Sequence, residues 1–152
     1  MEQLNLPTYS FKIKQEGQRK LIFDSIRKKY VVLTPEEWVR QNFVKYLNEE
    51  KNYPLSLMSL ETEQKIHTAR RRTDILIYNV QGIPVMIVEC KAPVIKLNDK
   101  AFEQAAGYNF TLNVNYLILT NGLKHHCLKL DIEKKKWEFM KDIPDYCEVK
   151  NW

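Results

Sequence analysis

The sequence predicts an α/β domain with a mixed central sheet flanked by helices, and three observations support this prediction. Two helical segments, at about 35–50 and 100–112, lie on either side of three apolar strand segments. A fourth strand segment at 115–120 follows the second helix, which gives the core order α-β-β-β-α-β. The chain has 152 residues, of which 44% are hydrophobic, and this is enough to bury the core of one domain.

The first 33 residues are expected to form a β extension in front of this core. The segment 10–14 alternates polar and apolar residues, the segment 16–18 is typical of a turn, and the segment 21–23 resumes the alternation. This pattern predicts an N-terminal β-hairpin. A further short strand is expected at 30–33.

The first helix has a clear beginning. Thr34 is suited to the N-cap and Pro35 to the first helical position, while Glu36 and Glu37 lie at the positive end of the helix dipole. Glu36 precedes the apolar stripe by three residues, so we expect it on the inward face, with Glu37 further to the side. The stripe consists of Val39, Phe43, Tyr46 and Leu47, and the helix is expected to end at about Glu50.

The remaining elements follow in chain order. Strands are expected at 55–66, 73–78 and 83–90, a helix capped by Asn98 or Asp99 at 100–112, a strand at 115–120, and a C-terminal hairpin of 127–131 and 136–140. We therefore expect a single domain, 1–152, that consists of an N-terminal β extension (1–33), a core (34–130) and a C-terminal hairpin and tail (131–152).

Composition excludes several classes of protein. The formal net charge of +5 is compatible with a polyanionic partner. The apolar runs are far shorter than the roughly 20 residues that a membrane span needs, and the N-terminus lacks the pattern of a signal peptide. The three cysteines form no C-x-x-C pair, which argues against a disulfide scaffold and most structural zinc sites. We expect a cytoplasmic protein.

Three charged residues, Asp74, Glu89 and Lys91, lie in or beside strongly apolar strands, where unpaired charges are rare. If the turn between the strands has an even number of residues, Tyr78 faces Ile83 and Asp74 faces Ile87. The three charged side chains then emerge on one face of the sheet. An odd loop or a bulge would place Asp74 on the other face.

Two carboxylates beside a lysine form a coherent catalytic set. Carboxylate oxygens select Mg²⁺ or Mn²⁺, and the backbone carbonyl of Cys90 is a further candidate ligand. Such a metal neutralises phosphate charge and lowers the pKa of a bound water. The lysine can hold or deprotonate that water and stabilise charge on the phosphorus.

Asp74, separated by fourteen residues from Glu89-Cys90-Lys91, resembles the Asp…Glu-x-Lys motif of the PD-(D/E)XK nuclease superfamily. Gln104 and Tyr108, four apart on the second helix, are similar to the Q-x-x-x-Y motif of one branch of that superfamily. The amino-acid sequences of segments 35–41, 88–93 and 119–122 are especially similar to the N-terminal nuclease domain of type I restriction enzyme R (restriction) subunits. The resemblance covers roughly 34–130 and implies a restriction-endonuclease-like core.

The resemblance also implies roles for individual residues. Asp74 and Glu89 would bind the divalent metal and Lys91 would be catalytic. The helix glutamate of the family matches Glu36 or Glu37, and Glu36 is preferred because of its inward position. Gln104 and Tyr108 would support the site and contact DNA.

A basic run, Arg70-Arg71-Arg72, directly precedes this set. A solvated loop and a phosphate-binding segment are both open interpretations.

The sequence thus favours a metal-dependent deoxyribonuclease with DNA as its partner. The alternative is a non-catalytic or partner-dependent DNA-binding or interaction module that keeps the nuclease fold. The R subunits that this sequence resembles continue into a helicase-like motor, but the 152 residues contain no G-x-x-x-x-G-K-[ST] phosphate-binding loop. The chain is therefore expected to be either a free-standing relative or an isolated domain. The resemblance implies a helicase-like translocase or a specificity subunit as a further partner. A homodimer, which is common among nucleases that cut both strands, stays an open alternative.

Overall fold

The computed structural model describes residues 1–66 and 69–151, and for 64–66, 69–71 and 108–112 it describes the backbone alone. In chain order the elements are β1 (Ile13–Glu16), β2 (Arg19–Asp24), β3 (Lys29–Val32), α1 (Pro35–Glu49), the short 3-10 helix η1 (Leu55–Leu57), β4 (Met58–Ile66), β5 (Ala69–Tyr78), β6 (Pro84–Cys90), α2 (Asp99–Leu112), β7 (Tyr116–Thr120), β8 (His125–Asp131), β9 (Lys136–Met140) and α3 (Tyr146–Val149). The order α1-β4-β5-β6-α2-β7 confirms the predicted core.

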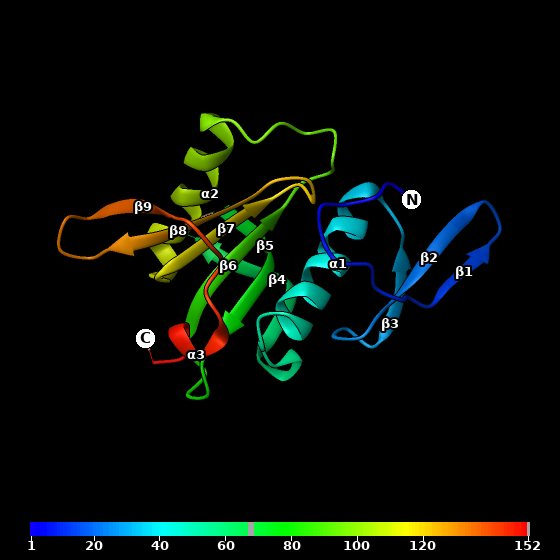
Figure 1. Ribbon diagram of the computed structural model, residues 1–152, viewed down its shortest axis with the longest axis horizontal. Coiled ribbons are helices and arrows are strands. Elements are labelled where there is room, and N and C mark those ends of the chain that lie inside the picture. The colour runs from blue at the N-terminus through cyan, green and yellow to red at the C-terminus, as the bar shows by residue number, and fades with distance from the viewer. Residues whose placement is uncertain (67–68, 152) are drawn as a thin grey trace.

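The central sheet has six strands in the spatial order β4-β5-β6-β7-β8-β9 (Figure 1). Strands β6 and β7 run parallel, and their neighbours pair antiparallel. A parallel pair needs a long crossover connection, and α2 provides it. The sheet is therefore mixed, as predicted, and the predicted C-terminal hairpin β8–β9 forms its far edge.

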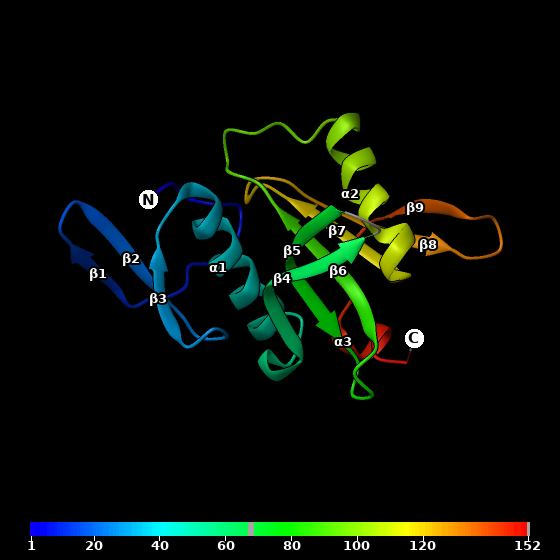
Figure 2. The ribbon, with the colours of Figure 1, turned by 180° about the vertical axis from the view of Figure 1, so that it is seen from behind.

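The two long helices cover opposite faces of this sheet (Figure 2). One core packs α1 against the sheet and includes Val39, Phe43, Leu47, Ile75, Ile77, Val88 and Ile118. The other packs α2 against Leu76, Ile87, Leu117 and Leu128. Alternate residues of β5 and β7 enter different cores, as the two-residue period of a strand requires.

The N-terminal residues form a separate antiparallel sheet of three strands, β1-β2-β3. The predicted hairpin is present, and the strand at 30–33 joins it. In Figures 1 and 2 this sheet lies on the side of α1 that faces away from the central sheet. Asp24, fully buried at the end of β2, fixes it there by accepting hydrogen bonds from the Arg27 N–H (2.9 Å) and from Gln41 Nε2 of α1 (3.1 Å).

Two boundary predictions were wrong. The segment 55–57 is a 3-10 helix rather than strand, because the Leu57 N–H bonds to the Pro54 carbonyl (3.0 Å). Strand β5 begins at Ala69, so the arginine run 70–72 lies in a strand rather than in a loop. This extension pairs with the far end of β4, where Arg72 lies opposite Glu63.

The predicted pairing of Tyr78 with Ile83 and of Asp74 with Ile87 was also wrong. Tyr78 pairs with Pro84 across a connection of residues 79–83, and the register then shifts at a bulge. The side-chain oxygen Oδ1 of Asn79 fixes this turn by accepting hydrogen bonds from the backbone N–H groups of Gln81 and Ile83, each at 3.0 Å. The odd loop and the bulge together move the register by two residues, and a shift of two leaves Asp74 on the expected face.

None of the described helices combines the length and the apolar character that crossing a membrane requires.

Gly122, in the turn after β7, should resist substitution. Its φ is +81°, and a Cβ there would lie 2.7 Å from Leu4 Cδ2 and 3.1 Å from Val39 Cγ2. We expect Gly122→Ala to lower the free energy of unfolding by about 2 kcal/mol, measured by urea denaturation. Gly82→Ala is the matched control: its φ is +77° but no atom lies within 4 Å, so the loss should be about 1 kcal/mol. Equal losses would show that crowding at Leu4 contributes nothing.

Candidate functional site

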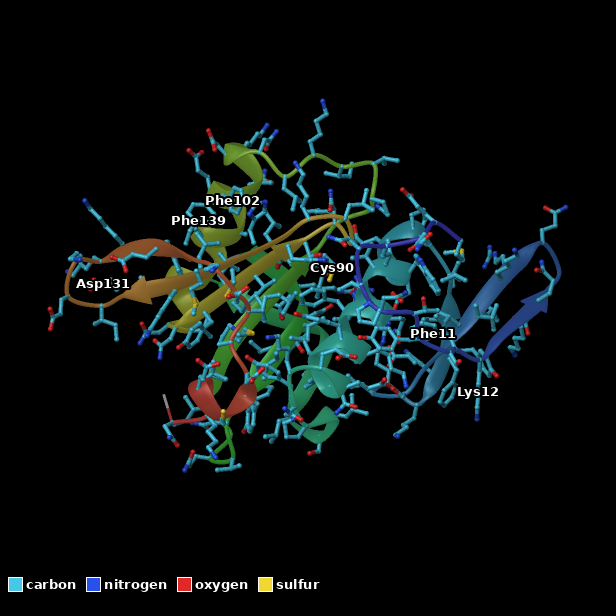
Figure 3. All side chains as sticks on the ribbon, in the orientation of Figure 1. Phe11, Lys12, Cys90, Phe102, Asp131 and Phe139 are labelled. Atoms are coloured by element: carbon cyan, nitrogen blue, oxygen red, sulfur yellow. The ribbon has the colours of Figure 1, made fainter. Side chains whose placement is uncertain are left out.

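The carboxylates of Asp74 on β5 and Glu89 on β6 converge between the two long helices, since Asp74 contacts Arg40 of α1 and Glu89 adjoins Gln104 of α2. Ile75 pairs with Val88, so the next step of the same register places Asp74 opposite Glu89. Asp74 Oδ2 accepts the backbone N–H of Cys90 at 2.7 Å. Figure 3 labels Cys90, the residue after Glu89, near the middle of the view, and the Asp74 side chain is 13% exposed.

Glu89 is buried, with 7% of its surface exposed. Burial, the charge of Asp74 and a hydrogen bond with Asp74 raise the pKa of Glu89 to about 8, and Lys91 opposes the rise. Glu89 Oε1 has no hydrogen-bond partner among the described residues. Strongly perturbed acids of this kind gather at functional sites.

Lys91 and Gln104 adjoin Glu89. The Lys91 N–H donates to the Thr120 carbonyl of β7 (2.8 Å), which fixes the backbone just beyond β6. Together with Ala101, Ala105 and Leu119, these three side chains line a hollow of about 30 Å³. The structure therefore brings Asp74, Glu89, Lys91 and Gln104 together.

The two helix glutamates have different surroundings. Glu36 leaves 45% of its side chain exposed; burial and Asp74 raise its pKa, whereas Arg40 and Lys91 lower it. Glu37 is buried and accepts hydrogen bonds from Arg27 Nη2 (2.7 Å) and Gln41 Nε2 (2.8 Å). Glu37 is therefore committed to structural bonds, which favours Glu36 as the site residue.

Arg40 is a member of the site that sequence reasoning missed. Its side chain is 4% exposed, and Nη2 donates to Asp74 Oδ1 (2.7 Å) and lies 2.7 Å from Glu61 Oε1 and 3.4 Å from Glu36 Oε1. The other terminal nitrogen, Nη1, pairs with Glu37 Oε2. Its position four residues after Glu36, on the same inward face, is the signal that could have found it.

Ion pairs continue from Arg40 to the N-terminal sheet. Glu37 joins Arg40 to Arg27, and Arg27 Nε pairs with Asp24. We call this series, Asp24–Arg27–Glu37–Arg40–Asp74, the ion-pair chain. Burial alone would lower the pKa of Arg40, but Asp74 and Glu37 raise it, so the guanidinium stays charged.

Glu61 of β4 was also missed, and here the sequence offers no signal. The β4–β5 ladder pairs Leu60 with Ile75 and Thr62 with Thr73 but skips Glu61 and Asp74. Glu61 has a φ of +53°, which is uncommon for a residue other than glycine. This backbone carries its carboxylate to Arg40, and such departures concentrate at functional sites.

Some predicted site residues cannot be placed in the site. The side chains of Tyr108, Arg70 and Arg71 lie outside the described residues. Arg72 is 63% exposed and pairs with Glu63 (3.0 Å) and Glu61 (3.5 Å). Its guanidinium thus belongs to the β4–β5 surface.

The carboxylate oxygens of the site are the type of ligand that a divalent cation prefers, but they are not arranged as a ready metal-binding cluster. Among the described residues, no three Asp, Glu, His or Cys side chains already form a cluster that could hold a metal ion. Carboxylates nevertheless converge from α1, β4, β5 and β6, and hard oxygen ligands of this type bind Mg²⁺ or Mn²⁺. Arg40 supplies the positive charge among them.

Residues 35–144 match the sequence family described as the type I restriction enzyme R protein N terminus (HSDR_N). The match covers well over half of the chain and includes the whole candidate site. The chain belongs to this family. For the HSDR_N family the sequence match begins at α1, so β1, β2 and β3 lie outside it.

A solved structure shows the same fold as this HSDR_N chain. It is a fragment assigned to the HsdR subunit of a type I restriction enzyme from Vibrio vulnificus YJ016, with 18% sequence identity and a TM-score of 0.57. The similarity covers 78% of this chain and 25% of that one, so this chain spans about a quarter of its length. Curated proteins give no match to this sequence.

Removing the Arg40 charge should destabilise the protein strongly. Arg40→Met would leave Asp74 without its buried cation and Glu37 with Arg27 alone, and we expect a loss of about 3–5 kcal/mol in the free energy of unfolding. Arg72→Met, which removes an exposed arginine from ion pairs on the same sheet, should change it by less than about 1 kcal/mol. Urea titrations followed by circular dichroism measure both. Similar values for the two variants would contradict a central role for Arg40.

The stability of the metal-free protein should fall as the pH rises. The pKa of Glu89 is raised in the fold from an ordinary 4.5 to about 8, so its contribution is fully present below 4.5 and is lost as the pH rises through 8. We expect the melting temperature in EDTA to decrease over this range, and Glu89→Gln to remove most of the decrease. Parallel pH profiles for the two proteins would disprove this.

Proposed function

We propose that this protein is a metal-dependent deoxyribonuclease of the PD-(D/E)XK superfamily, Q-x-x-x-Y branch. The observation that carries the proposal is the juxtaposition of Asp74, Glu89 and Lys91 on one face of the sheet. Membership in the HSDR_N family supports it, because that family is named for a restriction enzyme.

The partly unsatisfied state of Glu89 supports a cation at this site. An acid with a raised pKa and a buried oxygen without a partner would gain from a nearby positive charge. Asp74 and Glu89 would hold Mg²⁺ or Mn²⁺, with the Cys90 carbonyl and Glu36 as further oxygen ligands. Bound there, the ion would neutralise phosphate charge and lower the pKa of the attacking water.

The chain's own residues would perform the remaining steps. Lys91 Nζ would hold the water or accept its proton, and would stabilise the charge that develops on the phosphoryl oxygens. The water oxygen bonds to phosphorus while the bond to the leaving sugar oxygen breaks. Gln104, beside Glu89 and Lys91, would position these groups or the DNA strand, as would Tyr108.

Arg40 competes with a cation for Asp74 in this proposal. Its Nη2 bonds to Asp74 Oδ1 and uses one of the two lone pairs of that oxygen. The half-exposed Glu36 and the partly exposed Glu61 offer Arg40 alternative carboxylates close by. Arg40 could therefore exchange partners within this cluster when a cation binds.

The wider setting follows from the family. The chain would act on DNA together with other type I restriction subunits, such as a translocase or a specificity subunit, and in the cytoplasm. A homodimer would let two such sites cut both strands.

A second candidate is a DNA-binding or interaction module that does not cut by itself. The observation that favours it is the bond of Arg40 to Asp74, which already neutralises that carboxylate. In this case a partner would be needed to free the site.

A cleavage assay with separate metal-binding measurements tests the proposal. Duplex, single-stranded and branched DNA, and RNA, would be incubated with the protein in EDTA, Mg²⁺ or Mn²⁺. We expect DNA to be cut only with metal, and Asp74→Ala and Lys91→Ala to slow cutting by about 100-fold or more. Lys135→Ala, an exposed lysine at the tip of the β8–β9 hairpin, is the control and should cut like wild type.

Titration calorimetry with Mn²⁺ separates the two candidates. Binding that Asp74→Ala abolishes, without cutting, would indicate an intact site that waits for a partner. Neither binding nor cutting would overturn the nuclease proposal and leave the interaction module.

A further inference from the structure

Positive charge is concentrated in the N-terminal sheet, outside the region that matches the HSDR_N family. The segment 12–32 has two acidic residues, Glu16 and Asp24, and seven basic ones: Lys12, Lys14, Arg19, Lys20, Arg27, Lys28 and Lys29. Its net charge of +5 equals that of the whole chain, so the rest of the protein is neutral overall. The surplus charge of the molecule therefore lies in one small sheet.

One face of this sheet combines the lysines with aromatic rings. Opposed residues share a face, and Lys14 lies opposite Leu21 while Phe23 lies opposite Tyr30. Two contacts confirm the common face: Lys12 Nζ lies 5.9 Å from the centroid of the Phe23 ring, and Lys14 Nζ lies 4.5 Å from that of Tyr30. The two rings pack edge to face with centroids 5.3 Å apart.

We call this surface the basic face, and define it by Lys12, Lys14, Arg19, Phe23 and Tyr30. Glu16 also lies on it, 3.7 Å from Lys14. Lys20 and Lys29 lie opposite Gln15 and Asp24, on the other side of the sheet.

The basic face continues into a hollow between the sheet and α1. The hollow measures about 260 Å³, and Lys12, Phe23, Lys45, Ser10 and Ser25 are among the residues that line it. Figure 3 shows Lys12 at the root of β1, with α1 between it and Cys90. The hollow is thus separate from the candidate active site.

We propose that the basic face binds the phosphate backbone of a nucleic acid, without sequence preference. Lys12 and Lys14 are alternate residues of an extended segment and stand about 7 Å apart, a spacing comparable to that of successive phosphates along a strand. The Tyr30 ring beside Lys14 is 39% exposed, and exposed aromatic rings provide stacking surfaces for the bases of a single strand. The β1–β2 hairpin projects from the body of the molecule, so a strand can reach it (Figure 1).

This inference does not depend on the nuclease proposal, because it concerns binding alone. Fluorescence anisotropy with labelled single-stranded and duplex DNA of random sequence, in EDTA, measures binding without cleavage. We expect Lys12→Gln/Lys14→Gln to weaken binding about tenfold and to reduce the slope of log affinity against log salt by about 2.

The matched control is Lys20→Gln/Lys29→Gln, which removes the same charge from the other side of the same sheet. We expect it to bind within about twofold of wild type, since only phosphate contacts carry the salt-dependent free energy. Equal weakening by both variants, or wild-type affinity in the first, would overturn the proposal. So would tighter binding of polyglutamate than of DNA, which would indicate an acidic protein partner. Melting temperatures within a few degrees of wild type show that each variant is folded.

Discussion

A single buried guanidinium holds three parts of this molecule in register. Arg40 projects from α1, bonds to Asp74 on β5 and Glu61 on β4, and shares Glu37 with the N-terminal sheet through Arg27. Burying so much charge is unfavourable unless every member has a partner. Apolar packing holds α1 on the sheet, and Arg40 fixes Glu36 and the carboxylates of β4 and β5 relative to one another.

Two apolar cores, one on each face of the central sheet, allow the acidic groups to gather between the helices. Apolar packing on both faces of the sheet provides the stability that the carboxylate cluster does not. Within the cluster Asp74 is paired, whereas Glu89 retains an oxygen without a described partner. Arg40 Nε likewise has no hydrogen-bond partner among the described residues, so the polar groups of this cluster are not fully satisfied.

Much of the architecture could be read from the sequence. The N-cap at Thr34 accepts the Glu37 N–H as expected, and the apolar strands and the second helix lie close to their predicted bounds. The Asp74–Glu89 face was also correct, although for an unexpected reason, since the loop and the bulge compensate each other. Local chemistry determines these features, so local patterns reveal them.

The parts that could not be read depend on contacts distant in the chain. Glu61 enters the site only because its backbone adopts a positive φ opposite Asp74, and nothing in its neighbours indicates this. Arg40 could be recognised as inward, but its partners come from three other elements. The start of β5 at Ala69 likewise reflects pairing with β4 rather than the turn preference of an arginine run.

The ion-pair chain has one more consequence. It joins the buried end of β2 in the N-terminal sheet to the candidate site through alternating charges, from Asp24 to Asp74. Thermodynamic linkage is reciprocal: a ligand that draws Arg27 away from Glu37 would change cation affinity at Asp74 by the same factor by which the cation changes that ligand's affinity.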